Sequence, residues 1–212
     1  MRRYSALESV TIELDRALRT LAAPDSIQNR ELPGSAPVRP VLNERERKHA
    51  AGLMRINHAG EVAAQALYFG HAAQARAPET RALMLNAARE EGDHLAWCAQ
   101  RLKSLGSQPS LFGPVWYGGA YALGALSARV SDRFALGFVA ETEAQVEAHL
   151  LDHQTRLPEA DLRSREVLAQ MRGDEIAHGA QASAAGAQKL PWPVPILMRK
   201  AADVMRAVAY RI

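Results

Sequence analysis

Glu91-Gly92-Asp93-His94 and Glu175-Ile176-Ala177-His178 are two copies of one pattern, a glutamate followed three residues later by a histidine. Each copy follows another glutamate at nearly the same distance, Glu61 before the first and Glu143 before the second. Residues three apart share one helix face, so each pair can bind one metal ion or contact two. A lone Glu from each of two helices, with Glu-x-x-His from each of the other two, is the ligand arrangement of two-metal sites in ferritin-like four-helix bundles. The doubled pattern therefore predicts both a fold and a metal centre.

Capping and breaking signals divide the rest of the chain into helices that suit this arrangement. Four bundle helices are expected at 43–75 (capping box Asn43 to Glu46), 78–106 (opened by Pro78), 131–157 (capped by Ser131) and 158–189 (opened by Pro158). An apolar segment, 111–130, joins the two helical hairpins, and such a long crossover is the ferritin-like form of the bundle. We expect an all-α domain over residues 41–212 that ends in an amphipathic helix, 196–211. Residues 1–40 are expected to be an N-terminal arm with a short helix at 9–21.

Composition argues against several other classes of protein. The net charge is only +3, and no basic stripe with interleaved aromatic residues is present, so nucleic acid is not an expected partner. Cys98 is the single cysteine, which excludes an internal disulfide and a thiolate metal site and fits a reducing compartment. Acidic residues soon follow Met1-Arg2-Arg3, so no secretory signal is expected.

Carboxylates and imidazoles are the expected metal ligands, and this mixed oxygen and nitrogen set suits a pair of iron ions with positions open for dioxygen. Buried carboxylates without compensation cost several kcal/mol each, roughly, and metal coordination is the simplest compensation. The predicted ligands are Glu61, Glu91, His94, Glu143, Glu175 and His178.

Two ambiguities accompany this ligand set. A third Glu-x-x-His, Glu46 to His49, has no partner at matching spacing and is interpreted as a solvated helix start. On the third bundle helix, Glu141, Glu143 and Glu147 compete. Superposing the two halves of the chain favours Glu143, and Glu147 stays the alternative because it lies one turn away on the same face.

Three longer motifs extend the pattern: Asn57-His58-Ala59-Gly60-Glu61, Glu90-Glu91-x-x-His94-Leu95 and Asp174-Glu175-x-x-His178. Together with Pro114-Val115-Trp116, the Ala-Leu-Gly-Ala of 122–125 and Arg206-x-x-x-Tyr210, they resemble the demethoxyubiquinone hydroxylases of ubiquinone biosynthesis over about residues 43–212. The resemblance implies a non-haem di-iron monooxygenase that uses dioxygen to hydroxylate the ring of a polyprenylated methoxy-methyl-benzoquinol.

The resemblance also implies roles for individual residues. Glu61 and Glu143 would be ligands able to shift as oxygen binds, and His149 matches a histidine near the site. Arg206 and Tyr210 match positions associated with electron delivery from NADH. The chain departs from the family on the third bundle helix, where His149 has no adjacent histidine to form a His-His pair and where the glutamates Glu141 and Glu143 are not adjacent.

Two apolar segments are candidates for membrane contact. The crossover 111–130 has the length to span a bilayer, but its proline and glycines favour an interfacial or re-entrant segment, with an ordinary core segment as the other alternative. The last helix has an apolar stripe, with Trp192 before it and cations at Arg199, Lys200, Arg206 and Arg211, which suits an anionic bilayer surface or a helix packed on the bundle. We expect a peripheral protein at the cytoplasmic face of the cell membrane, forming a homo-oligomer or binding other proteins of ubiquinone biosynthesis.

Two rival functions remain at this stage. The first is iron storage or peroxide detoxification, as in relatives of ferritin and rubrerythrin. The apolar crossover, the basic last helix and the lack of a rubredoxin-type cysteine cluster argue against it. The second is a non-catalytic quinone-binding scaffold, which would not need all six ligand residues.

Overall fold

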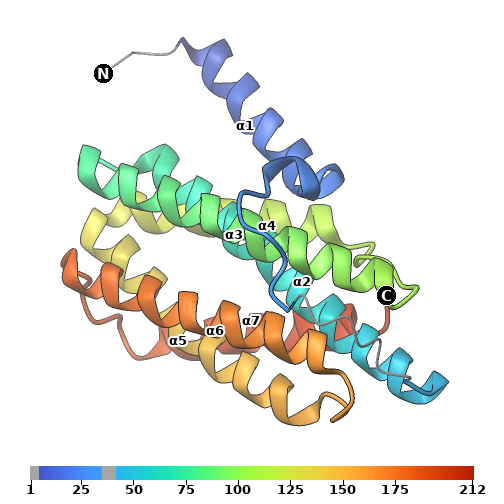
Figure 1. Ribbon diagram of the computed structural model, residues 1–212. Coiled ribbons are helices and arrows are strands. Elements are labelled where there is room, and N and C mark those ends of the chain that lie inside the picture. The colour runs from blue at the N-terminus through green and yellow to red at the C-terminus, as the bar shows by residue number, and fades with distance from the viewer. Residues whose placement is uncertain (1–4, 35–41) are drawn as a thin grey trace.

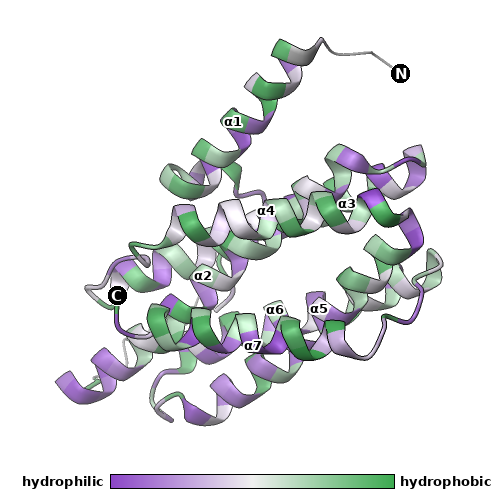
Figure 2. Cartoon of the chain, turned by 180° about the vertical axis from the view of Figure 1, so that it is seen from behind, coloured by the Kyte–Doolittle hydropathy of each residue, from purple (hydrophilic) through white to green (hydrophobic). Residues whose placement is uncertain are grey.

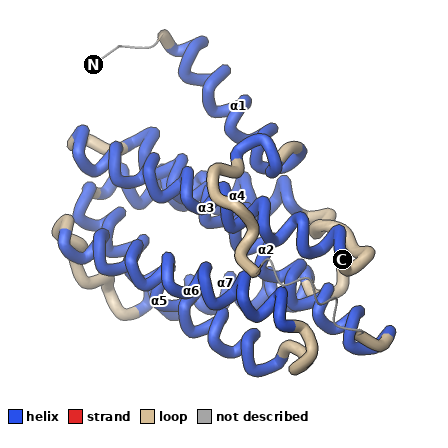
Figure 3. The backbone as a smooth tube through the Cα atoms, viewed as in Figure 1, coloured by secondary structure: helices blue, strands red, loops and turns tan. Residues whose placement is uncertain are grey.

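Every regular element in the described part of the chain, residues 5–34 and 42–212 of the computed structural model, is helical (Figures 1 and 3). The elements are α1 (Ala6–Ala22), the 3-10 helix η1 (Pro24–Ile27), α2 (Glu44–Gln74), α3 (Pro78–Ser104), α4 (Gly113–Val130), α5 (Asp132–Arg156), α6 (Leu162–Ala184) and α7 (Pro193–Ala209). The predicted all-α, ferritin-like bundle is confirmed: α2 with α3 and α5 with α6 form the two hairpins, and α4 is the crossover.

The start of α2 is the predicted capping box. The side-chain oxygen of Asn43 accepts a hydrogen bond from the backbone N–H of Glu46 at 3.0 Å, and the Glu46 carboxylate accepts one from the backbone N–H of Asn43 at 2.9 Å. This reciprocal pair satisfies two of the N–H groups that a helix start leaves without partners.

The expected bounds of the fourth bundle helix were wrong at both ends. Pro158 begins a turn, and α6 starts only after Asp161, whose carboxylate accepts from the backbone N–H of Ser164 at 3.1 Å. Asp161 is fully buried and also pairs with Arg101 of α3 at 2.7 Å, so this contact between hairpins decides where the helix begins. The helix ends at Ala184, ahead of Gly186 with its positive φ of 99°, which a residue with a side chain would adopt only with strain.

The crossover α4 packs tightly along α2. A Cβ atom added to Gly124 would lie 2.2 Å from the backbone oxygen of Leu67, and one added to Gly70 would lie 2.2 Å from the backbone oxygen of Tyr121. Glycine at both positions therefore lets the two helix backbones touch. Among the helices of the described residues, none combines the length and the apolar character that crossing a bilayer requires.

Two of the buried hydrophobic clusters lie toward the two ends of the bundle helices. One cluster contains Leu53, Trp97, Leu150 and Met171, and the other contains Tyr68, Met84, Leu136 and Ala182. Each bundle helix contributes to both clusters, so the residues midway along each helix meet in the centre of the bundle.

The N-terminal arm contacts the bundle more closely than an arm outside the core would. Helix α1 projects away from the bundle, and the loop after it crosses the outer face of α3 toward α6 (Figure 1). The buried hydroxyl of Thr20 donates to the side-chain oxygen of Gln65 in α2. On the opposite face of α1, Leu7, Val10, Leu14 and Leu18 form an exposed apolar stripe, visible in green in Figure 2.

Candidate metal centre

Six acidic and histidine side chains meet in the middle of the bundle. Each is at most 5% exposed, and together they come from all four bundle helices: Glu61 (α2), Glu91 and His94 (α3), Glu143 (α5), Glu175 and His178 (α6). These are the six residues that the sequence pattern selected, and the structure brings them all together.

The six side chains divide into two groups of four that share two members. Glu91 and Glu175 belong to both groups, while Glu61 and His94 complete one and Glu143 and His178 complete the other. In each group, the potential ligand atoms lie within 4.8 Å of one another.

The shared glutamates direct one oxygen to each histidine. Glu91 places Oε2 3.1 Å from Nδ1 of His94 and Oε1 3.2 Å from Nδ1 of His178. Glu175 does the same at 3.3 Å and 3.5 Å. This is the geometry of two carboxylates that can bridge a pair of cations.

The outer nitrogen of each histidine contacts a carboxylate from the other hairpin. Nε2 of His94 lies 2.9 Å from Asp174, and Nε2 of His178 lies 2.8 Å from Glu90. Because a carboxylate only accepts, these contacts place the proton on Nε2 and leave Nδ1 free to bind a metal. The sequence motifs included Glu90 and Asp174 without assigning them a role. Their position could have indicated this role, because Glu90 directly precedes Glu91 and Asp174 directly precedes Glu175.

On α5, the structure places Glu143 in the cluster and Glu147 outside it. Glu143 accepts a hydrogen bond from the hydroxyl of Tyr68 at 2.5 Å, whereas Glu147 pairs with Arg172 at 2.8 Å. The third Glu-x-x-His is also outside: Glu46 caps α2, and His49 contacts the hydroxyl of Tyr210 at 2.8 Å.

Burial and mutual contact shift the pKa values in opposite directions. Burial raises the pKa values of Glu61 and Glu143 well above the usual range for carboxyls. For Glu91, burial acts in the same direction, but the close contacts with His178 and His94 outweigh it and lower the pKa well below that range. Burial lowers the pKa of His178, yet contacts with Glu175 and Glu91 outweigh it and raise the value to about 12. The metal-free cluster thus holds protons that divalent cations would displace.

The residues present fit a pair of divalent cations. Three buried atoms at the centre have no hydrogen-bond partner among the described residues: Oε2 of Glu61, Oε1 of Glu91 and Nδ1 of His178. Orphaned buried polar atoms are costly, and metal coordination satisfies them. Carboxylate oxygens with one imidazole on each side are a donor set that suits iron.

An apolar pocket opens onto the carboxylate side of the cluster. Its volume is about 380 Å³, and Glu61, Glu143 and Glu175 contribute to its lining. Most of the other lining residues are apolar or small and come from α2, α4, α5 and α7. Val115 and Leu123 of α4 line it and are 58% and 49% exposed, so the pocket reaches the apolar outer surface of the crossover.

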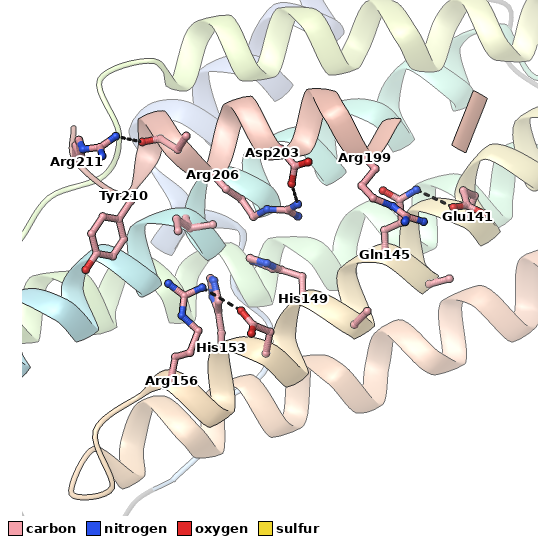
Figure 4. A pocket seen from close by; sticks show the side chains of 15 residues that line it. Glu141, Gln145, His149, His153, Arg156, Arg199, Asp203, Arg206, Tyr210 and Arg211 are labelled. Atoms are coloured by element: carbon pink, nitrogen blue, oxygen red, sulfur yellow. Dashed lines mark hydrogen bonds and ion pairs between the residues drawn. The ribbon is translucent and has the colours of Figure 1, made fainter. Parts of the chain in front are cut away.

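A second pocket, of about 780 Å³, lies between α5 and α7 (Figure 4). His149 and Arg206 line both pockets, whereas Tyr210 lines only this one. Four arginines reach the second pocket: Arg156, Arg199, Arg206 and Arg211. The three positions singled out by family resemblance therefore share the second pocket and lie outside the six-residue cluster.

The histidine of this group is held by a buried amide. Nε2 of His149 donates to the side-chain oxygen of Asn57 at 3.2 Å, and Nδ1 of His153 donates to the same oxygen at 2.9 Å. Burial lowers the pKa of His149 to about 4, so its imidazole is neutral at physiological pH.

Fold and site together define a ferritin-like helical bundle with two overlapping carboxylate–histidine groups that could hold metal ions. Residues 48–209 match the family described as ubiquinone biosynthesis protein COQ7, and the chain belongs to that family. It is 53% identical to a 3-demethoxyubiquinol 3-hydroxylase of Xanthomonas axonopodis pv. citri over 211 residues, covering 100% of this chain and 97% of the relative. It is also 53% identical over 208 residues to the protein of that name from Cupriavidus metallidurans, covering 97% of this chain and 100% of the relative.

Proposed function

We propose that this chain is a di-iron monooxygenase, a 3-demethoxyubiquinol 3-hydroxylase, which hydroxylates the ring of a polyprenylated methoxy-methyl-benzoquinol with dioxygen as co-substrate. The observation that carries the proposal is a pair of four-residue groups, joined by Glu91 and Glu175, at the end of an apolar pocket. Family membership and about 50% identity to hydroxylases along the whole chain support the same reaction.

The six cluster residues would hold the metal ions, and Glu91 and Glu175 would contribute to both groups of ligands. When bound, two iron ions supply the oxygen activation that no protein side chain provides. Tyr68 holds one oxygen of Glu143, and the outer carboxylates fix both histidine rings. The apolar walls of the 380 Å³ pocket exclude water and place a quinol ring beside Glu61, Glu143 and Glu175.

His149 is the proposed polar contact for the ring. Its Nε2–H is engaged by Asn57, which leaves Nδ1 as an acceptor for a quinol hydroxyl. Because burial keeps this imidazole neutral, it can accept a hydrogen bond from that hydroxyl and orient the ring.

The test compares two glutamates one helical turn apart on α5. Glu143→Ala should lose metal binding and quinol hydroxylation, while Glu147→Ala should retain both because its side chain contacts Arg172 instead. Iron per chain and hydroxylated product are measured for the same preparations. Full activity in Glu143→Ala would overturn the proposal, and hundreds of irons per chain in the parent protein would support storage instead.

We further propose that NADH delivers electrons from the arginine-lined pocket. Four guanidinium groups suit the diphosphate of a dinucleotide, and the pocket borders the quinol pocket at His149 and Arg206. Arg206→Gln should weaken NADH binding measured by calorimetry, with the exposed Arg163→Gln on α6 as control. Equal affinity in both variants would contradict this part.

Peripheral attachment to the cytoplasmic face of the cell membrane is the third part of the proposal. Val115, Leu123, Leu126 and Val130 of α4 are all about half exposed or more, and the first two border the quinol pocket. A lipid tail could therefore stay in the bilayer while the ring enters the bundle. Leu126→Glu should reduce co-flotation with anionic vesicles, whereas Leu162→Glu at the start of α6 should not. Unchanged flotation of Leu126→Glu would contradict the proposed orientation.

A further inference from the structure

We propose that Arg30, in the N-terminal arm, is a positioning residue that holds Asp174 against His94 and so completes the outer side of one half of the metal centre. The inference rests on the proposed metal centre. It gives the arm a role in the site, although the arm lies outside the bundle that carries the ligands.

Three side chains form a continuous line from the arm to the cluster. The Nη1 atom of Arg30 lies 2.8 Å from Oδ2 of Asp174. The same Oδ2 atom accepts from Nε2 of His94 at 2.9 Å. Arg30 therefore contacts the very atom that fixes the ring of a proposed ligand.

The arm holds Arg30 firmly in this place. Its Nε atom pairs with Oδ2 of Asp93 at 2.8 Å, and the backbone N–H groups of Asn29 and Arg30 donate to Oδ1 of Asp93 at 2.5 Å and 3.0 Å. The guanidinium stacks over Trp97 at 4.8 Å, and the indole N–H donates to the backbone oxygen of Arg30 at 3.2 Å. Asp93 is only 2% exposed, so it serves as a buried anchor for the arm.

The two halves of the centre differ at this point. On the His94 side, the Asp174 side chain is 17% exposed and is held by Arg30 and, through its other oxygen, by Gln170 at 3.0 Å. On the His178 side, Glu90 is 49% exposed. In the described part of the chain, Glu90 pairs with His178 and with no arginine. The two groups of cluster residues are therefore nearly symmetric, but the carboxylates that contact Nε2 of the two histidines are not held equally.

This asymmetry has a consequence for metal binding. A ligand whose outer partner is fixed loses less freedom when the ion binds, and outer partners change metal affinity by about 10- to 100-fold. Arg30 acts one step further out, so its loss should weaken one of the two ions by about 3- to 10-fold and leave the other near its original affinity. Lysine at this position offers a point charge without the planar fork that reaches two carboxylates, and so should restore little.

The experiment is a titration of the metal-free full-length chain with cobalt(II), followed by calorimetry and by visible absorption. Parent protein, Arg30→Gln, Arg30→Lys and the matched arm control Arg19→Gln are compared. Arg19 pairs with Asp15 on α1 and is half exposed. We expect one weakened binding step and an altered cobalt spectrum in both Arg30→Gln and Arg30→Lys, and parent behaviour in Arg19→Gln.

A double-mutant cycle tests whether Arg30 acts through Asp174. Asp174→Asn should weaken the same step more strongly, and Arg30→Gln should add little in that background. Parent-like binding of both ions by Arg30→Gln, equal weakening of both steps, or a full additional loss on top of Asp174→Asn would overturn the inference. If the parent chain itself failed to bind two ions, the proposed function would fail instead, so the two failures are distinguishable.

Discussion

Gly124→Ala is the sharpest test of how α4 positions the quinol pocket. The new methyl group would lie 2.2 Å from the backbone oxygen of Leu67 and 3.1 Å from the backbone nitrogen of His71. Ordinary contact begins near 3.4 Å, and backbone atoms cannot rotate aside as a side chain can. Helix α4 must therefore move away from α2 by about 1 Å.

The expected loss of stability follows from this displacement. Overpacking of this kind costs about 1–3 kcal/mol, and the better helix propensity of alanine offsets about 0.5–1 kcal/mol of it. The net loss is at most about 2.5 kcal/mol, and at about 2–4 °C per kcal/mol for a chain of this size the melting temperature should fall by up to about 10 °C. Since α4 also forms a wall of the apolar pocket, quinol affinity should fall, while the number of bound metal ions should not change.

The assay is thermal unfolding followed by circular dichroism, with quinol binding and metal content measured on the same samples. Gly118→Ala is the matched control. Gly118 lies on the same helix as Gly124, and a Cβ atom added there would meet nothing within 4 Å. It should be neutral or slightly stabilising. A melting temperature for Gly124→Ala equal to that of Gly118→Ala would refute the reasoning about the α2–α4 contact.

Three further predictions concern the buried polar groups. Metal affinity should rise with pH through the neutral range, because Glu61 and Glu143 have raised pKa values and must release protons when a metal binds. A cobalt titration at several pH values measures this, and an affinity that does not change with pH would count against it. Tyr68→Phe removes the donor to Glu143 and should lower the free energy of unfolding of the metal-free chain by about 1–3 kcal/mol in urea titrations, and no loss would mean that this contact is dispensable. Arg101→Ala leaves Asp161 buried without its partner and should cost about 3–5 kcal/mol by the same measurement, a result that an effect below 1 kcal/mol would contradict.

The clustering of the six acidic and histidine residues was predictable because helical periodicity carries most of the information. Glu91 and His94 are three residues apart, and so are Glu175 and His178, so each pair had to share a helix face. The repeat of that pair after a lone glutamate then indicated the bundle. The choice of Glu143 over Glu147 came from comparing the two halves, and the structure places Glu143 in the cluster.

Two of the missed features depend on contacts between residues far apart in the chain. Pro158 has the local character of a helix start, but the buried ion pair of Asp161 with Arg101 moves the start of α6 to Leu162. Arg30 contacts Asp174 of α6 from the N-terminal arm, and no local pattern in the sequence predicts that contact. Periodicity describes one helix at a time, so it does not predict the ion pairs of Asp161 with Arg101 or of Arg30 with Asp174.

The central claim is that one pair of glutamates serves two metal sites, and metal stoichiometry tests it most directly. The purified chain, reconstituted with iron(II) under anaerobic conditions, should bind two ions, and Glu91→Ala should lose both because Glu91 belongs to both groups of ligands. Glu147→Ala, as control, should bind two. A parent chain with fewer than two ions, or a Glu91→Ala variant that still binds two, would contradict the account.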